Sequence, residues 1–207
     1  DELIRRPEAL GWKITSVLTG KGVPNEIITS AEPGTSRSVR IDGKAQPQIA
    51  LSKIARVVWL VPSMDRLWIE GAEGRRRFLD RITMSFEPYH AEAVLTYEKG
   101  MRERNRLLKD MVRDAHWYVA LERQMAEAGA RMTANRRKAL ARLATASTGA
   151  KTAFPSPTLS MTHADGPLPN DAEELGQALA DNRPSDLRAG RTLIGPPRID
   201  LHALFTA

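Results

Sequence analysis

The stretch Tyr97-Glu-Lys-Gly-Met-Arg-Glu-Arg-Asn-Arg-Leu-Leu-Lys109 lies within a seven-residue pattern that predicts a long amphipathic helix. One set of positions holds Val94, Met101, Leu108 and Ala115, and the companion set holds Tyr97, Arg104, Met111, Tyr118 and Met125. Arg104 is the polar exception in this apolar seam. Pro88 suits the first turn of the helix, where a backbone N–H has no partner within the helix.

A second helical stretch follows, from about His116 to Ala146. Gly129 interrupts it, at a cost of about 1 kcal/mol relative to alanine. We expect a turn near residues 110–115, which would fold the two helices against each other as an antiparallel hairpin.

The residues before about Pro62 predict β-structure. Alternating residues over Trp12–Leu18 and a second run at Glu26–Thr29 indicate two strands, and Asp42-Gly43 predicts a hairpin turn between two more. The mostly apolar run Ile54–Val61 predicts a buried strand. The segment therefore predicts an antiparallel meander followed by one buried strand.

The residues after the hairpin predict short elements separated by loops. Thr158–Met161 predicts a strand inside a segment rich in Ser, Thr, Pro and Gly, Ser147–Pro169. Asp171–Asn182 predicts a short helix with an N-cap residue at its start. Arg191–Gly195 and Ile199–Phe205 each predict a β run.

The charge of the chain is concentrated in one region. The 207 residues carry 31 Lys and Arg against 25 Asp and Glu, and the segment 130–151 holds six basic residues and no acid. Such a patch suggests a polyanionic partner, although many basic proteins bind no nucleic acid. Cysteine is absent, which excludes disulfides and thiolate metal sites and fits a cytoplasmic protein, and no apolar run reaches the length of a membrane span.

No catalytic or metal-binding motif stands out in the sequence. Neither G-x-x-x-x-G-K-[ST] nor G-x-G-x-x-G occurs, and the nearest string, Thr19-Gly-Lys-Gly22, lacks the spaced first glycine. The histidines are His90, His116, His163 and His202, and no pair has ligand spacing on one helix. We therefore predict no catalytic residue and no metal site within this chain.

Seven basic residues are candidates for contact with DNA phosphates: Arg75, Arg76, Arg77, Arg104, Arg136, Arg137 and Lys138. The first three point about 100° apart on a helix, so they cannot all face one partner. They either contact phosphates or form salt bridges between lobes, or one of them pairs with a nearby acid while the others are solvated. The region of Arg104 has helical salt-bridge spacing, which favours an exposed charged face. The last three have no acidic residue nearby in sequence and are the better candidates, and their phosphate contacts would make binding depend on salt.

Two blocks of sequence resemble the RecF family. The first is Trp59-Leu-Val-Pro-Ser-Met-Asp-Arg-Leu-Trp68, then Gly71-Ala-Glu-Gly-Arg-Arg-Arg-Phe-Leu-Asp-Arg81, then the stretch ending at Lys109. It is similar in order and spacing to the family's Pro-x-x-Asp-Leu-like stretch, Arg-Arg-x-Phe-Leu-Asp and Tyr-x-Lys…Arg-Asn-x-Leu-Leu-Lys. The second, Gly190-Arg-Thr-Leu-Ile-Gly-Pro-Pro-Arg-Ile-Asp-Leu201, resembles the family's Gly-Pro-His-Arg-Asp-Asp-Leu.

The family-motif positions of the chain are Pro62, Asp65, Arg198 and Asp200. Pro197 and Ile199 depart from the family, which has His and Asp there. The resemblance implies an α+β fold in three parts. These are an antiparallel β subdomain of an ABC- and SMC-like ATPase lobe (residues 1–66), a helical second lobe with an antiparallel hairpin (67–188) and a return into the ATPase lobe (189–207).

The resemblance also implies a function. The family binds DNA at junctions of single and double strands, is a weak DNA-dependent ATPase using ATP and Mg²⁺, forms an ATP-dependent homodimer, and loads recombinase with RecO and RecR. The Walker A, signature and Walker B motifs are absent here, and the chain begins with Asp1 rather than Met. We therefore expect an internal fragment that does not hydrolyse ATP alone.

Two alternatives remain open at the level of sequence. One is a stand-alone helical-hairpin interaction module with a β cap, and the other is a different SMC-like ATPase with a shortened helical arm. The gene sequence on either side would separate them, because a Walker A motif upstream with signature and Walker B motifs downstream supports the RecF assignment.

Overall fold

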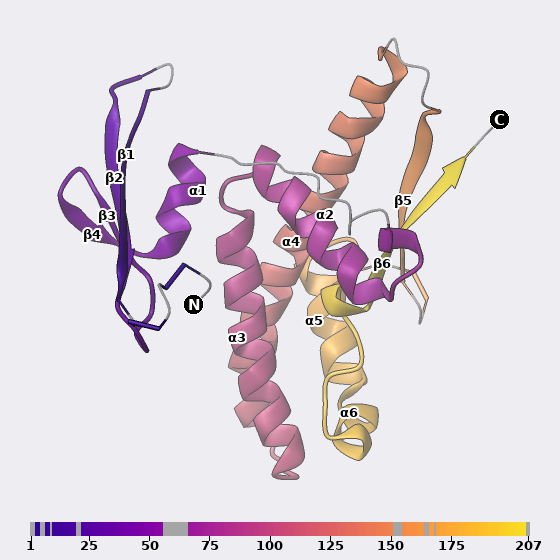
Figure 1. Cartoon of the computed structure of the whole chain (residues 1–207). Coiled ribbons are helices and arrows are strands. Elements are labelled where there is room, and N and C mark those ends of the chain that lie inside the picture. The colour runs from indigo at the N-terminus through magenta and orange to yellow at the C-terminus, as the bar shows by residue number, and fades with distance from the viewer. Residues whose placement is uncertain are drawn as a thin grey trace. The chain divides into compact units, whose positions relative to one another are not determined.

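The computed structural model describes residues 3–4, 7–8, 10–19, 22–55, 66–150, 155–163, 166–167 and 169–205. The chain divides into two compact units, Asp1–Arg56 and Val57–Ala207. Figure 1 shows the elements of each unit along the chain. The predicted boundaries at residues 66 and 188 stay predictions.

The first unit contains the predicted antiparallel meander. Its sheet has the order β1-β2-β3-β4, made by Trp12–Leu18, Asn25–Ala31, Ser38–Ile41 and Lys44–Gln46. Asp42 and Gly43 both have positive φ, 48° and 75°, as a two-residue turn matched to strand twist requires. The predicted hairpin at this dipeptide is thereby confirmed.

After the sheet, the chain forms the 3₁₀ turn η1 (Gln48–Ala50) and the short helix α1 (Leu51–Ile54). The buried strand predicted for Ile54–Val61 is wrong at its first residue, because Ile54 ends a helix. Residues 56–65 lie outside the described part of the chain, and with them Pro62 and Asp65.

The second unit is built on a pair of long helices. Helix α2 is Ala72–Phe86, α3 is His90–Lys109 and α4 is His116–Thr148. Helices α3 and α4 lie side by side (Figure 1), and Gly100 and Arg104 of α3 approach Met125 and Glu122 of α4, as an antiparallel pair demands. The predicted helical hairpin is therefore confirmed.

The larger core cluster of this unit lies between the hairpin and α5 (Ala172–Asp181). Its buried residues are Ala93, Tyr97, Met125, Ala126, Ala128, Met132, Leu175 and Leu179. The predicted seam is interrupted at the hairpin turn, where Met111 has φ 54° and is 50% exposed, while its later positions Tyr118 and Met125 are buried on α4. Gly129, predicted as an interruption, is buried inside α4 instead of breaking it.

The C-terminal part adds a small helix and a two-stranded sheet. Helix α6 is Arg183–Ala189, and β5 (Pro157–His163) pairs antiparallel with β6 (Ile199–Phe205). Asp171 caps α5, since its side chain accepts a hydrogen bond from the Glu174 N–H at 2.9 Å. None of the described helices combines the length and the hydropathy that crossing a bilayer requires.

The strand predicted for Arg191–Gly195 is wrong. The backbone N–H groups that would pair with another strand donate to side chains instead. The Thr192 N–H donates to Asn105 at 2.7 Å, and the Leu193 N–H donates to Asp186 at 3.0 Å. Gly195 then adopts φ 103° and ψ −171°, a backbone conformation that is essentially restricted to glycine. The chain leaves it through the turn η3 (Pro196–Arg198) and enters β6.

Candidate nucleic-acid interface

The three consecutive arginines near the start of α2 have three different environments. Arg75 makes a bidentate ion pair with Asp200, with Nε–Oδ1 and Nη2–Oδ2 distances of 2.8 and 2.9 Å, and so ties α2 to β6. Arg76 is half-buried and donates one long hydrogen bond to the Ile199 carbonyl, at 3.4 Å. Arg77 is exposed beside Glu73, at 3.2 Å. Hydrogen bonding by Arg75 holds the pKa of Asp200 below its usual range.

Arg104 is fully buried, and its guanidinium is surrounded by acceptors from α4, α5 and α6 and by the Thr192 hydroxyl at 2.9 Å. It donates to Glu122 at 3.1 Å, to Asp186 at 2.6 Å and to the Leu179 carbonyl at 3.0 Å. The exposed face expected here is wrong for this residue. Buried ions need such partners, because taking a charge out of water is costly.

A second arginine shares the Glu122 carboxylate. Arg183 of α6 donates to both its oxygens, at 3.0 and 2.6 Å, and lies 5.2 Å from the centre of the Tyr118 ring. Two arginines and two acids thus connect α3, α4 and α6 in one network.

Arg136 also lies inside the unit, although the sequence around it has no acid. It makes a bidentate pair with Asp80 of α2, at 2.7 and 2.9 Å, and donates to the Pro196 carbonyl at 3.1 Å. His90 Nε2 lies 2.8 Å from the same Asp80 carboxylate. Burial opposes the charged carboxylate, but the hydrogen bonds from His90 and Arg136 outweigh it and lower the pKa of Asp80.

The exposed basic residues of this region lie on the outer side of α4. They are Arg131, Arg137, Lys138 and Arg142. Arg137 reaches the Asn170 side chain at 3.4 Å, and Arg142 lies over the Phe86 ring at 5.5 Å from its centre. Residues 131, 138 and 142 fall within about 40° of one another around a helix, so they form one stripe. We call these three residues together with Arg137 the α4 basic surface.

The motif loop positions Asp200 and Arg198 at the beginning of β6. Arg198 is exposed at the end of η3, while Asp200 faces Arg75. Gly195 of the same loop leaves no room for a side chain, because a Cβ there would collide with the Tyr97 hydroxyl. Sequence inspection missed this role of Gly195, as well as the buried carboxylate of Asp186, because their partners are far away in sequence.

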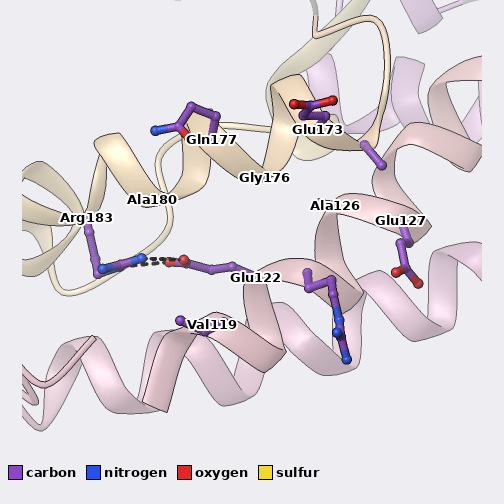
Figure 2. A pocket seen from close by; sticks show the side chains of 11 residues that line it. Val119, Glu122, Ala126, Glu127, Glu173, Gly176, Gln177, Ala180 and Arg183 are labelled. Carbon is purple, nitrogen blue, oxygen red and sulfur yellow. Dashed lines mark hydrogen bonds and ion pairs between the residues drawn. The ribbon is translucent and has the colours of Figure 1, made fainter. Parts of the chain in front are cut away.

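A groove of about 430 Å³ runs between α4 and α5. Its floor holds the small residues Ala126, Gly176 and Ala180, and the Glu122–Arg183 ion pair closes one end (Figure 2). The groove has no cluster of nucleophile, base and acid. Across the described ranges, no group of three or more His, Asp or Glu side chains could hold a metal ion.

Comparison with known proteins identifies the family, although no protein-family model matches the chain. The chain is 42% identical over 185 residues to the DNA replication and repair protein RecF of Brucella suis, covering 80% of this chain and 45% of that protein. The Agrobacterium fabrum protein of the same name is 38% identical over 205 residues, covering 94% and 54%. The chain belongs to the RecF family.

Further comparisons agree with this assignment. The RecF of Caulobacter vibrioides is 38% identical over 216 residues, which cover 96% of this chain and 56% of that protein. The chain thus spans about half the length of the curated relatives it matches. Solved structures of the recombination mediator protein RecF with ATPrS and with ATP superpose with TM-scores of 0.79 and 0.78 at 19% identity, which supports the fold alone.

Proposed function

We propose that this chain is part of a RecF-like DNA repair protein and supplies its helical lobe. The observation that carries the proposal is the 38% identity over 94% of the chain to a protein named for DNA replication and repair. The buried network around Arg104 supports it, because that network holds α3, α4 and α6 as one body that can present a fixed surface.

We infer that the α4 basic surface contacts DNA phosphates. Its four side chains are exposed, and α4 contains no acidic residue from position 130 to its end at Thr148 that could neutralise them. Arg104 and Arg136 are excluded from this role because their guanidinium groups are buried against carboxylates. Arg75 is likewise engaged with Asp200, whereas Arg77 is exposed and is retained as an outlying contact.

The remaining activities concern the whole protein. Of the two solved RecF structures, one is described with ATP and the other with ATPrS, and the descriptions of both name the RecFOR pathway. By analogy, we propose that the full-length protein binds ATP and Mg²⁺ through motifs absent from this sequence, dimerises with ATP, and acts at gapped DNA with RecO and RecR. This chain alone would bind DNA without hydrolysing ATP.

A segment exchange tests the repair function. The matching segment of the Caulobacter vibrioides RecF is replaced by this chain, and survival after ultraviolet irradiation is measured in cells lacking their own protein. The chimera is expected to restore survival to within about tenfold of the natural protein. The matched chimera carrying Arg137→Glu and Lys138→Glu is expected to accumulate normally and fail to restore it.

Two results would contradict the proposal. One is a chimera that is abundant and soluble yet leaves survival at the level of the deletion strain. The other is equal rescue by the chimera with and without the two charge reversals, which would remove the α4 basic surface from the function.

A further inference from the structure

A second basic feature, made by residues other than those of the α4 basic surface, lies beside the start of α2. It is a cavity of about 370 Å³ lined by Arg76, Thr162, Pro197, Arg198, Asp200 and His202. These residues come from α2, β5, η3 and β6, so the cavity forms only where the motif loop meets the arginine triplet.

Arg76 is the least satisfied arginine of the triplet. A guanidinium has five N–H donors in a fixed fork. Among the described residues, Arg76 uses one of them, in the 3.4 Å hydrogen bond to the Ile199 carbonyl. Its half-buried position limits how fully water can replace the missing acceptors. The cavity therefore presents N–H donors of Arg76 that have no acceptor among the described residues.

The charges around the cavity also favour an anion. Burial lowers the pKa of Arg76, and the positive charges of Arg136 and Arg198 act in the same direction, against Asp200 and Glu73. The Asp200 carboxylate is already engaged by Arg75, with both oxygens accepting at 2.8 and 2.9 Å. The charge of Asp200 is thus largely compensated by Arg75, whereas Arg76 keeps N–H groups that no acceptor among the described residues engages.

We propose that this cavity binds a phosphate group, held by the guanidinium of Arg76 with Arg198 at the rim and the Thr162 hydroxyl and His202 ring as further donors. Arginine suits this ligand because its fork matches two phosphate oxygens. The phosphate comes either from a free nucleotide or from a nucleic-acid backbone. Only the choice between these two sources of phosphate rests on the proposed function.

Titration of the ¹⁵N-labelled chain tests the cavity. The arginine Nε–H resonances are followed by NMR at constant ionic strength with three probes: sodium phosphate, ATP without Mg²⁺, and a ten-nucleotide oligothymidine lacking terminal phosphates. Arg76→Gln and Arg198→Gln are each expected to weaken saturable binding at least tenfold. Arg188→Gln, on exposed α6 surface, is the matched control and should change affinity less than twofold.

The outcomes discriminate the ligand and the proposal. Saturation by phosphate and ATP alone assigns the cavity to free nucleotides. Saturation by the oligonucleotide that Arg76→Gln weakens assigns the cavity to the nucleic-acid backbone. The melting temperature of each variant is measured first, and a loss of binding counts only in a variant that keeps the wild-type value. Absence of saturation with all three probes, or equal weakening in Arg188→Gln, overturns the inference. If instead the α4 basic surface does not contact DNA, the Arg137→Glu, Lys138→Glu variant will bind the oligonucleotide as the unchanged chain does. That result is independent of the cavity.

Discussion

At the residue scale, arginines that are neighbours in sequence have different roles because their partners differ. Arg75 is fixed by Asp200, 125 residues away, whereas Arg77 pairs with Glu73 four residues before it. Spacing along a helix can predict the second kind of pair but carries no information on the first. Of the seven arginines and lysines predicted to contact DNA, sequence alone could not separate the buried Arg104 and Arg136 from the exposed Arg137 and Lys138.

The buried network around Arg104 makes a prediction about stability. Replacing Asp186→Asn leaves Arg104 buried with one charge partner fewer, and should lower the free energy of unfolding by about 3–5 kcal/mol. Glu98→Gln is the control, since its pair with Arg102 is exposed and 3.7 Å long, and should cost about 1 kcal/mol or less. Urea denaturation measures both. A loss below 1 kcal/mol for Asp186→Asn would mean that the network does not stabilise the fold.

At the element scale, periodicity predicted α3 and α4, and turn residues predicted the N-terminal hairpin. The seven-residue pattern located α3 and α4, and Asp42-Gly43 located the β3–β4 turn. The failure at residues 191–195 occurs where tertiary contacts override local preference. The 191–195 segment is apolar enough for a strand, but Asn105 and Asp186 bind its backbone N–H groups.

Gly129 gives the element-scale prediction. A Cβ at this position would lie 2.6 Å from a Leu175 methyl carbon and 3.1 Å from Pro196 Cγ, so the glycine lets α4 approach both α5 and η3. Gly129→Ala should therefore destabilise the chain by about 1–3 kcal/mol, despite the better helix propensity of alanine.

The matched control is Gly74→Ala in α2, where the nearest atom to the added Cβ is Glu70 Oε2 at 3.8 Å. It should be neutral or stabilise by up to about 1 kcal/mol. Thermal unfolding of the two variants compares them. Equal effects would show that helix propensity, rather than close packing at Gly129, decides the outcome.

At the scale of the whole molecule, the seven basic residues that the sequence singled out have different environments. Arg75, Arg104 and Arg136 pair with acids inside the second unit, Arg137 and Lys138 lie on the α4 basic surface, Arg76 lines the proposed phosphate cavity, and Arg77 is exposed beside Glu73. The net charge of +6 alone could not make this distinction. The RecF assignment was accessible from the motifs at 59–110 and 190–201, because order and spacing of several short motifs are specific where single clusters are not.

The salt dependence of DNA binding tests the central claim, that the α4 basic surface of this RecF lobe contacts phosphates. Fluorescence anisotropy with a gapped duplex is recorded from 50 to 200 mM NaCl, and log K is plotted against log salt concentration. Each lost phosphate contact should reduce the slope by about 0.9, so Arg137→Glu with Lys138→Glu should flatten it by about 2 and weaken binding. Arg102→Glu with Arg188→Glu makes the same change in net charge on other exposed helices and should leave the slope nearly unchanged. Identical slopes for the two double variants would contradict the account.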